Sequence, residues 1–575
     1  MNGTLGDFLR DVAARHGNRP ALLYRPRYRT DRWTYRRLWR ESGRVALWLR
    51  GRGIAAGDRV VLWAPNSPWW VATYFGALRL GAIVVPLDIR SDRGFASRVA
   101  GQTELRLAVV APPVQPDGLG DVPLVAMDRL VAELDPDDAR DDGPLATEVT
   151  PDSIAEIMFT SGTTGDPKGV VLTHRNILAS VDGVSRVLPG GHDYRLLSLL
   201  PLSHMFEQTV GLLLPLHYGA RVYYPASRQP AAIFRDLARE RATAILAVPQ
   251  ALELFMDAIE REVTKRGRRA VWEGMLRIAA YLPLHLRQLL FAGVRRRLGG
   301  HLRLLVSGGA ALDPAVARKW ELLGVSVLQG YGATEAAPCI TTEGLDARRP
   351  GTVGRAVPGV ELRLAPDGEA LVRGANVTHG YWRNEDATAA AFADGWYRTG
   401  DLGVLDGDGY LTLRGRKKNV IVLDDGQNVY PEDVEDTLRH EPGVRDALVF
   451  GDRSARGGTR VRAVLLLDGA ADPNAIVRAA NRRLDARQQI RDATRWPDDD
   501  FPRTHTLKVK RDAVLAALAP EGTGDAARAH RTAGQHGDDE ATSPLWTRSH
   551  DRRTGWEVIL PRFQVGIRQE CAREP

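Results

Sequence analysis

The hydrophobic pattern between about residue 40 and residue 360 changes repeatedly between two periods. Segments with an apolar residue every three or four positions, which is the helical spacing, alternate with short apolar runs that end at Gly, Pro or Asp. Residues 41–53 and 69–81 have the helical spacing, whereas residues 58–65 and 82–88 have the composition of buried strands. This alternation predicts doubly wound α/β layers.

The same alternation returns later in the region. Residues 230–242 have the helical spacing, and residues 243–249 form a short apolar run. Residues 302–312 and 325–335 read as strands that end in glycine-containing turns. The layered arrangement is therefore expected to continue to about residue 360.

The pattern of hydrophobic and turn-forming residues is different in the rest of the chain. From about residue 350 to residue 415 the strands are short and the turns dense, which predicts a small β-barrel-like subdomain. Residues 416–520 have the mixed pattern of a compact α+β unit. The predicted fold class is α/β, with a large N-terminal domain, residues 1–415, of two doubly wound α/β layers plus the small subdomain. A smaller α+β C-terminal domain, residues 416–520, follows.

Residues 521–575 are expected to be a linker and tail. The first part is polar and poor in large apolar residues, which is typical of disorder. The last thirty or so residues could hold a hairpin or no structure. Their role is open between a docking arm and a non-functional extension.

The apolar stretches most similar to membrane spans are interrupted by polar side chains. Trp69–Leu87 contains Arg79, and Leu196–Leu216 contains Glu207, so both are expected in the core. Residues 1–17 have the pattern of a short amphipathic helix and not of a signal peptide.

Cysteine content and charge narrow the function classes. The two cysteines, Cys339 and Cys571, cannot make a disulfide framework, which favours a reducing, cytoplasmic location. The 78 Lys and Arg residues exceed the 71 Asp and Glu residues by only 7, so general attraction to anions is expected. No array of cations with interleaved aromatics or zinc-finger spacing is present, so a nucleic-acid partner is not expected.

The segment "FTSGTTGDPKG", residues 159–169, combines glycines, hydroxyl side chains and one lysine between two apolar runs. Gly162, Gly165 and Gly169 would allow positive φ and a close approach to a ligand. Backbone N–H groups with such side chains form an anion-binding loop. The Walker spacing is absent, and a polar turn between two strands is the alternative.

Five further motifs follow this loop: "LPLSHMFEQ" (200–208), "GYGATEAAP" (330–338), "YRTGDL" (397–402), "GRKKNVIVLDDGQNVYPEDVE" (415–435) and "PRTHTLKVKR" (502–511). In this order, the six motifs resemble those of the adenylate-forming superfamily of acyl-CoA synthetases and AMP-dependent ligases. The resemblance covers about residues 5–518. It implies that a carboxylate attacks the α-phosphorus of ATP to give an acyl-adenylate, and that the thiol of coenzyme A then expels AMP.

The resemblance implies that the first loop holds the β- and γ-phosphates of ATP. The residues concerned are Thr160, Ser161, Gly162, Thr163, Thr164, Gly165 and Lys168. The alternative for Lys168 is an ordinary solvated loop lysine.

The resemblance also assigns the adenine and α-phosphate contacts. The residues near the adenine are Gly308, Gly309, Ala310, Gly330, Tyr331 and Gly332. The ring of Tyr331 would stack on the base, and Thr334 would contact the α-phosphate. Glu335 would bind Mg²⁺, with an ordinary surface carboxylate as the alternative.

Three residues would act at the ribose and the reacting groups. By the same resemblance, Asp401 accepts hydrogen bonds from the ribose hydroxyls, and Arg416 adds a ribose or phosphate contact. A turn carboxylate is the alternative for Asp401. Lys508 would bridge the α-phosphate and the substrate carboxylate, with Lys510 close enough to share the work.

The C-terminal domain of such enzymes is mobile. Lys418 stands at the position of the hinge, although a plain exposed lysine is an equal alternative. The segment with Gly426 would line the coenzyme A tunnel.

The identity of the acid depends on weaker features. "TLKVKR", with Leu507 where many relatives have glycine, resembles the long-chain fatty acid–CoA ligases. His204, Met205 and Phe206 stand where relatives gate or line the acyl tunnel, a satisfied core histidine being the alternative for His204.

The segment Arg261–Arg303 is basic on one side and apolar on the other. That pattern predicts either a peripheral contact with the inner face of a membrane or a helix packed on the core.

The hypothesis is therefore a Mg²⁺-dependent long-chain fatty acid–CoA ligase with fatty acid, ATP and coenzyme A as substrates. The alternatives are a fatty acyl-AMP ligase that loads an acyl carrier protein, a ligase for a medium-chain or aryl acid, and an inactive scaffold on the same fold. The oligomeric state is open, with a homodimer as one option.

Overall fold

The computed structural model describes residues 1, 3–26, 29–135, 148–160, 166–227, 229–453, 458–503 and 508–518, all of which belong to one compact unit. Several predictions lie outside the described residues. They concern Ser161, Gly162, Thr163, Thr164, Gly165, Leu507 and residues 521–575.

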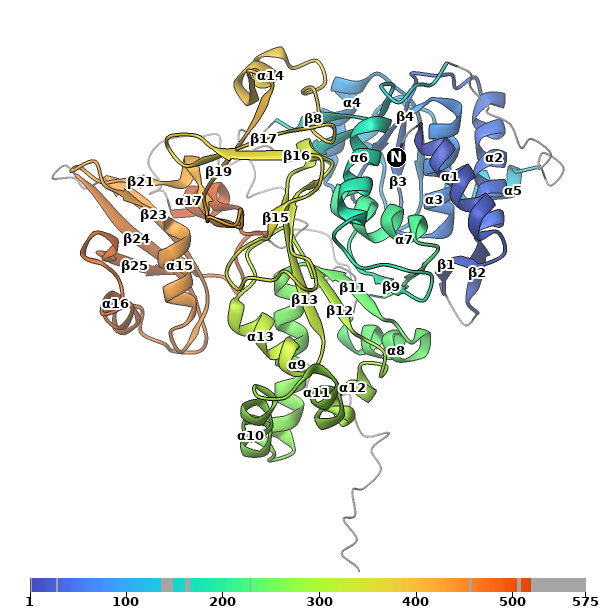
Figure 1. The fold of residues 1–575 in the computed structure, drawn as a ribbon. Helices are drawn as coiled ribbons and strands as arrows, with labels where there is room; N and C mark the ends of the chain where they lie inside the picture. The colour runs from blue at the N-terminus through green and yellow to red at the C-terminus, as the bar shows by residue number, and fades with distance from the viewer. Residues whose placement is uncertain are drawn as a thin grey trace, which may run out of the picture. The chain divides into compact units, whose positions relative to one another are not determined.

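The first layer is a six-stranded sheet in the order β6-β5-β3-β4-β7-β8. Figure 1 labels three of its strands, β3, β4 and β8, in the blue to green part of the ribbon. All neighbouring strands run parallel except β7 and β8, which form an antiparallel hairpin. The strands are β3 (Arg59–Trp63), β4 (Ile83–Pro86), β5 (Leu105–Val110), β6 (Leu124–Ala126), β7 (Ile154–Thr160) and β8 (Lys168–Thr173). The predicted runs 58–65 and 82–88 are thus strands β3 and β4.

Helix α3 (Pro68–Leu80) shows how local sequence sets a helix boundary. Ser67 caps the first turn by accepting a hydrogen bond from the Trp70 amide, and Pro68 fills the first helical position. Gly81 ends the helix in the left-handed conformation at φ 82°. Almost every residue of α3 is buried, as expected for a helix inside the core. The other helices of this layer are α1 (Leu5–His16), α2 (Tyr35–Gly51), α4 (Arg93–Thr103), η1 (Asp117–Leu119), α5 (Met127–Glu133) and α6 (His174–Ser185).

The second layer is a nine-stranded sheet in the order β15-β14-β13-β12-β11-β9-β10-β1-β2. The strands from β13 through β1 run parallel to their neighbours, and the outer strands are antiparallel. The strands are β1 (Pro20–Tyr24), β2 (Asp31–Thr34), β9 (Arg195–Ser198), β10 (Arg221–Tyr224), β11 (Ala244–Ala247), β12 (Leu304–Ser307), β13 (Ser326–Gly332), β14 (Cys339–Thr342) and β15 (Arg355–Ala356).

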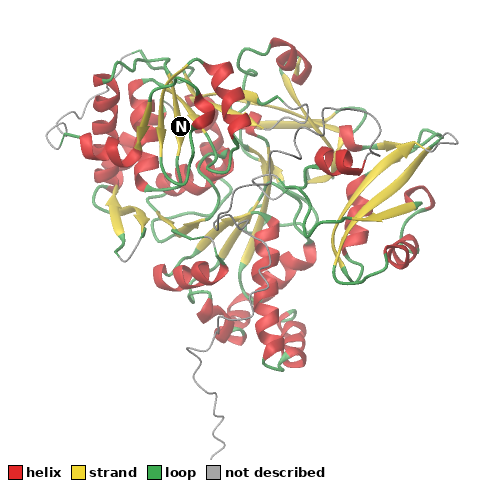
Figure 2. Cartoon of the chain, turned by 180° about the vertical axis from the view of Figure 1, so that it is seen from behind, coloured by secondary structure: helices red, strands yellow, loops and turns green. Residues whose placement is uncertain are grey.

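Between β9 and β10 the chain forms a buried π-helix, η3 (Glu207–Leu213), which continues as α7 (Leu214–His217). The segment Arg261–Arg303, predicted to be amphipathic, consists of the end of one long helix and three short helices, which Figure 2 shows in red among the outer helices. The helices of this layer are α8 (Pro230–Glu240), α9 (Pro249–Lys265), α10 (Arg269–Ala279), α11 (Leu284–Leu290), α12 (Ala292–Arg297) and α13 (Pro314–Leu322).

The β-rich subdomain is a five-stranded, mainly antiparallel sheet in which β19 pairs with β17, β18 and β20. It follows a 3-10 turn, η4 (Thr334–Ala336), that connects β13 and β14. Its elements are β16 (Val360–Leu364), β17 (Glu369–Gly374), α14 (Glu385–Ala391), β18 (Phe392–Ala393), β19 (Trp396–Leu405) and β20 (Leu411–Arg416).

The remaining described residues form a small α+β unit with apolar clusters of its own around Leu465 and Val464. Its strands make a two-stranded and a three-stranded sheet. The elements are η5 (Lys417–Asn419), β21 (Ile421–Val422), β22 (Asn428–Val429), α15 (Pro431–Arg439), β23 (Val444–Arg453), β24 (Thr459–Leu467), α16 (Pro473–Asn481), η6 (Ala486–Gln488), β25 (Asp492–Arg495) and α17 (Arg511–Leu518).

The predicted fold class is confirmed. Two α/β layers and a β-rich sheet precede a smaller α+β unit, in the predicted order. In the part of the chain that the structure describes, no helix is both long and apolar enough to cross a membrane.

Candidate active site

The ends of the predicted phosphate loop are brought together by the β7–β8 hairpin. Thr160 and Lys168 are opposite each other in its register, and the Thr160 hydroxyl lies 3.5 Å from the Lys168 carbonyl oxygen. The half-buried Lys168 ammonium lies over the ring of Tyr381, 5.3 Å from its centroid. The hairpin thus fixes the lysine beside an aromatic face.

Gly169 has a different role from the one predicted. Its φ is outside the left-handed region, so a ligand-facing positive φ is wrong for this glycine. A Cβ at this position would lie 2.8 Å from a methyl carbon of Ile157 and 2.9 Å from the ring of Phe159. The absent side chain therefore permits close packing of the hairpin.

The hydroxyl of Tyr381 connects the lysine to Glu335. It donates a hydrogen bond of 2.9 Å to Oε1 of Glu335, while the Tyr381 ring faces Lys168. Glu335 and its neighbour Thr334 lie on η4, and Thr378 donates its amide to the Glu335 carbonyl oxygen at 2.8 Å. Burial and the Glu335 charge raise the pKa of Tyr381, so its hydroxyl stays a neutral donor.

A second cluster surrounds Asp401. Tyr331 on β13 donates its hydroxyl to Oδ2 of Asp401 at 2.6 Å, and Arg416 lies 2.7 Å from Oδ1. Asp401 and Arg416 face each other in the β19–β20 register. Burial raises the pKa of Asp401, while Arg416, Tyr331 and Lys508 act in the opposite direction. The buried carboxylate is therefore held among donors and cations.

Lys508 belongs to this second cluster. The surrounding protein and Arg416 lower the pKa of Lys508, and Asp401 raises it. Lys508 remains accessible to solvent although protein surrounds it, so it lies in a partly open site. Lys510 is exposed, and its backbone amide donates to the Pro502 carbonyl oxygen at 2.7 Å.

Tyr397 connects the two clusters. Burial raises the pKa of Tyr397. Electrostatic interactions raise it further, in decreasing order, with Glu335, Tyr381, Tyr331 and Asp401. One buried phenol thus lies within electrostatic range of both carboxylates. Neither Tyr381 nor Tyr397 was predicted, although Tyr397 opens the motif "YRTGDL" and could have been found there.

The glycine pair predicted beside adenine follows β12. Gly309 has a φ of 86°, and Ala310 is half-buried. A Cβ on the buried Gly308 would lie 2.8 Å from the ring of Phe206, which places that ring directly against the glycine. Gly330 and Gly332 lie on β13, on either side of Tyr331.

The three predicted acyl-site residues have different surroundings. His204 Nε2 lies 3.2 Å from Oδ2 of Asp88, a buried carboxylate that also contacts Arg90. Burial opposes ionisation of Asp88, but hydrogen bonds from His204 and Arg90 lower its pKa. Met205 is packed in the main hydrophobic core, whereas Phe206 lies at its margin beside Gly308.

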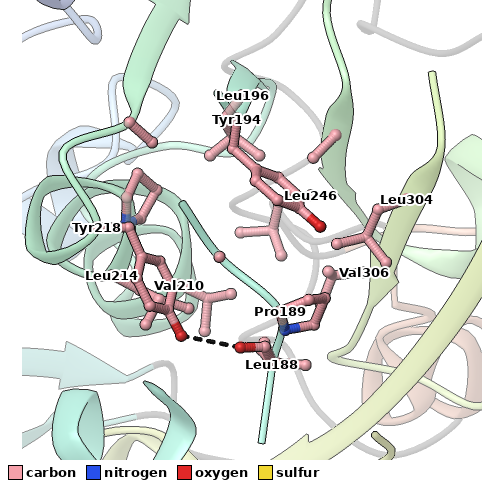
Figure 3. Close-up of a pocket in the computed structure, with 14 residues that line it drawn as sticks. Leu188, Pro189, Tyr194, Leu196, Val210, Leu214, Tyr218, Leu246, Leu304 and Val306 are labelled. Atoms are coloured by element: carbon pink, nitrogen blue, oxygen red, sulfur yellow. Dashed lines mark hydrogen bonds between the residues drawn. The ribbon is translucent and has the colours of Figure 1, made fainter. Parts of the chain in front are cut away.

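An apolar cavity of about 50 Å³ lies between the nine-stranded sheet and η3–α7 (Figure 3). Leu246 and Val306 line it from the sheet, and Val210 and Leu214 line it from the helices. Tyr218 closes one side and donates its hydroxyl to the Leu188 carbonyl oxygen at 2.8 Å. Since Val210 follows Phe206 by one helical turn, the cavity and the aromatic ring lie along one helical segment.

In the predicted hinge region, two adjacent lysines interact with different parts of the protein. Lys417 Nζ lies 2.9 Å from Glu369 and 2.5 Å from Asp367, at the β16–β17 end of the antiparallel sheet. The pKa of Lys418 is lowered by burial and raised by Asp512 on α17. Gly426 has a φ of 80° in the turn before β22.

Family models match both parts of the chain. The model for AMP-binding enzymes matches residues 9–382, and the model for the AMP-binding enzyme C-terminal domain matches residues 418–521. The long-chain-fatty-acid–CoA ligase FadD15 of Mycobacterium bovis is 31% identical over 548 residues, covering 83% of this chain and 89% of that protein. Indoleacetate–CoA ligase of Aromatoleum aromaticum is 31% identical over 509 residues, covering 83% and 91%.

A solved structure shows the same similarity. ATP-bound MatB from Rhodopseudomonas palustris superposes with a TM-score of 0.75 at 26% identity, covering 90% of this chain and 99% of that one. The two relatives above are equally similar to this chain, and their names refer to unlike acids. Similarity alone therefore does not select an acid for this chain.

Proposed function

We propose, on the premise that the chain belongs to the AMP-binding enzyme family, that it is a long-chain fatty acid–CoA ligase. The chain is an enzyme of the acyl-CoA ligase type, and ATP and coenzyme A are substrates of that family. We further propose that the acid is a long-chain fatty acid and that adenylate formation precedes thioester formation.

The observation that supports this reaction is the connected group around Tyr397. Lys168 and Glu335 meet through Tyr381, and Asp401, Arg416 and Lys508 form the other half. A reaction that brings a carboxylate to a polyphosphate needs cations near both anions and fixed donors around them. We assign Lys168 to the β- and γ-phosphates and Lys508 to the α-phosphate and the acid. Thr334, next to Glu335, is assigned to the α-phosphate.

Asp401 is suited to the ribose. Each of its carboxylate oxygens already accepts one contact, from Tyr331 or from Arg416, and each keeps a second lone pair. Two acceptors on one rigid side chain match the two neighbouring hydroxyls of a ribose. The hydroxyl bond to Asp401 also fixes the Tyr331 ring, which we assign to the adenine with Gly308, Gly309 and Ala310.

Glu335 fits a magnesium ion only in the company of phosphate oxygens. The described residues contain no group of three or more His, Cys, Asp or Glu that could hold a metal alone. Mg²⁺ commonly binds through one or two carboxylates plus substrate phosphates, which suits a single Glu335. When bound, the ion would neutralise phosphate charge.

The second half-reaction would require a rotation at Lys417 and Lys418, which interact with different parts of the protein. We propose that the C-terminal unit, residues 416–520, turns about these residues after the adenylate forms. Lys417 would stay with Glu369 and Asp367, whereas Lys418 would move with α17. Gly426 and its turn would then face coenzyme A.

The long acyl chain is supported by three features. FadD15 is similar over most of both chains, Phe206 lies next to the glycines assigned to the nucleotide, and an apolar cavity continues along Val210 and Leu214. This cavity is smaller than a long acyl chain, so a long chain requires the helices η3 and α7 to move. The small volume favours a second candidate, a ligase for an aryl or medium-chain acid.

The test is a comparison of acids with the purified full-length protein, ATP, Mg²⁺ and coenzyme A. We expect palmitoyl-CoA, AMP and pyrophosphate in equal amounts, with kcat/KM for palmitate at least tenfold above that for hexanoate or indoleacetate. The opposite preference would support the second candidate. AMP and pyrophosphate without a thioester would indicate a fatty acyl-AMP ligase, and no ATP–pyrophosphate exchange with any acid would indicate an inactive scaffold.

A further inference from the structure

The exposed apolar side chains of this protein are concentrated on two short helices. Ten large hydrophobic residues are exposed among the described residues, and six of them lie on α10, α11 and the turn between them. Tyr281 is 91% exposed and Leu289 is 70% exposed. We call this group the α10–α11 ridge, and its members are Val271, Ile278, Tyr281, Leu284, Leu286 and Leu289.

The ridge has the geometry of one surface. Val271 and Ile278 are seven residues apart on α10, which places them on one helical face, and Tyr281 continues that face into the turn. The adjacent face of α10 is buried through Trp272, whose ring centroid lies 5.4 Å from that of Phe291. Helix α11 buries none of its residues. Helix α10 is thus anchored through buried side chains, whereas α11 is held by hydrogen bonds such as that from Gln288 to the Gly324 carbonyl oxygen, and both leave apolar side chains in solvent.

Positive charge is concentrated in the same segment. Residues 261–303 contain eleven Lys or Arg and two Glu, a formal charge of +9, whereas the whole chain carries only +7. The rest of the protein is thus slightly acidic. A partner that binds this surface through electrostatic attraction must be anionic.

Part of this charge is used inside the protein. Arg295 is buried and donates to the carbonyl oxygens of Gly324 and Leu302, both at 2.9 Å. Arg266 and Arg269 pair with glutamates one helical turn away. These cations stabilise the helices and are not available to a partner.

Arg261, Arg297 and Arg303 also pair with carboxylates, and Arg287 donates to backbone carbonyl oxygens. Four of the eleven cations therefore remain for a partner. Lys265, Arg268, Arg277 and Arg296 are exposed, and no carboxylate among the described residues lies within ion-pair distance of them. Arg277 directly precedes Ile278, so charge and apolar surface alternate on α10. An apolar helix face next to solvated cations is the arrangement that binds an anionic bilayer surface, where side chains enter the interface and cations meet phosphates.

We propose that the α10–α11 ridge docks this protein on the surface of an anionic lipid bilayer. The ridge enters the headgroup region, and Lys265, Arg268, Arg277 and Arg296 contact lipid phosphates. No helix crosses the bilayer. The proposal is independent of which acid the enzyme activates.

Vesicle co-sedimentation of the full-length protein tests this directly. We expect binding to vesicles of equal phosphatidylglycerol and phosphatidylcholine at least tenfold stronger than to phosphatidylcholine alone, weakening as NaCl rises from 0.1 to 0.5 M because salt screens exposed charges. The double variant Ile278→Ser/Leu289→Ser should bind at least tenfold more weakly. The matched control Leu124→Ser/Val404→Ser changes two similarly exposed residues elsewhere and should bind like the parent.

A second pair of variants tests the contribution of positive charge to vesicle binding. Arg268→Gln/Arg277→Gln/Arg296→Gln should weaken binding and reduce its salt dependence. The control Arg50→Gln/Arg98→Gln/Arg460→Gln removes the same charge from exposed positions elsewhere and should do neither. Thermal melting and turnover of hexanoate without vesicles report whether each variant is folded.

Several outcomes would overturn the proposal. One is equal binding to neutral and anionic vesicles, and another is an equal loss in the control variants. A third is a change in the sedimentation coefficient of the free Ile278→Ser/Leu289→Ser protein with unchanged vesicle binding. That last result would assign the ridge to contact between copies of the chain.

Discussion

The carboxylate of Asp401 is shared between two partners, because Arg416 lies 2.7 Å from one oxygen and Tyr331 donates at 2.6 Å to the other. The three residues come from β13, β19 and β20. Their geometry makes Asp401 the point at which the α/β layers and the antiparallel sheet meet the nucleotide in our proposal.

Replacing Asp401 with Asn should weaken ATP binding by about tenfold to a hundredfold. The amide loses the charge that pairs with Arg416, and one of its two positions becomes a donor that cannot accept from Tyr331 or from ribose; hydrogen bonds to charged groups contribute about 1.5–3 kcal/mol. Isothermal titration of the full-length protein with ATP measures the change.

Asp394→Asn is the matched control for this variant. Asp394 is exposed in the turn between β18 and β19 of the same sheet, and its φ of 51° is one that Asn tolerates. Its ATP affinity should equal that of the parent. If both variants lose affinity equally, the effect comes from the charge of the sheet and not from a ribose contact.

Tyr381 offers a separate test of the link between Lys168 and Glu335. Tyr381→Phe keeps the ring under Lys168 but removes the 2.9 Å hydrogen bond to Glu335, so we expect ATP–pyrophosphate exchange to fall about tenfold, as for one lost hydrogen bond of about 1.4 kcal/mol. Tyr381→Ala removes both contacts and should cost more.

A magnesium titration of the exchange reaction distinguishes loss of the Tyr381–Glu335 hydrogen bond from a general loss of stability. If Tyr381 orients Glu335, Tyr381→Phe should need more Mg²⁺ for half-maximal rate. An unchanged Mg²⁺ requirement with a lowered melting temperature would assign Tyr381 to structure alone.

The helices and strands of the two α/β layers could be predicted from the sequence. Hydrophobic periodicity, and the residues that begin and end an element, are local features. Residues 69–81 predict α3 almost to the residue, since Ser67, Pro68 and Gly81 are the cap, first position and terminator of that helix. Residues 82–88 and 302–312 likewise contain β4 and β12. In each case the physical cause lies within a few residues of the element.

The connections within the site could not be predicted in this way. Tyr331 and Asp401 are separated by 70 residues, and they meet because β13 and β19 belong to neighbouring sheets. The hydrogen bond from Tyr381 to Glu335 has the same origin, and "HGYW" around Tyr381 carries no local signal. The sequence of Arg261–Arg303 predicts an amphipathic segment, but only the fold shows which of its apolar side chains stay in solvent.

Glu156 leads to a prediction about stability. This residue of β7 is fully buried, and its contact with the described residues is a 3.2 Å hydrogen bond from Gln208 to one carboxylate oxygen. Burial raises its pKa from 4.5 to about 8. The folded protein therefore holds a proton that the unfolded chain releases above its ordinary pKa.

Because the folded state binds more protons than the unfolded state, this residue stabilises the fold fully below pH 4.5, and the contribution is lost as pH rises toward about 8. The loss is about 1.4 kcal/mol per pH unit in that window. Glu156→Gln stays neutral, so its free energy of unfolding in urea should fall less between pH 5 and pH 8. Glu361→Gln, a change of an exposed glutamate, should keep the slope of the parent.

Lys508 and Lys510 differ in a way that kinetics can measure. Lys508 lies within electrostatic range of Asp401 and Arg416, and the protein around it and Arg416 lower its pKa. We expect Lys508→Ala to reduce ATP–pyrophosphate exchange by at least a hundredfold, because a charge that meets the developing transition state contributes several kcal/mol. Supplied with pre-formed acyl-adenylate, the same variant should still make the thioester.

Lys510→Ala is the neighbouring control, and it should retain most of the exchange activity. The lowered pKa of Lys508 also sets the sign of a pH effect: its ammonium is lost at a lower pH than that of a free lysine, so exchange should decline on the alkaline side before pH 10.5. In Lys508→Arg that decline should disappear, since a guanidinium stays charged throughout. Equal loss of both half-reactions in Lys508→Ala, or an unchanged alkaline profile in Lys508→Arg, would contradict the role assigned to this lysine.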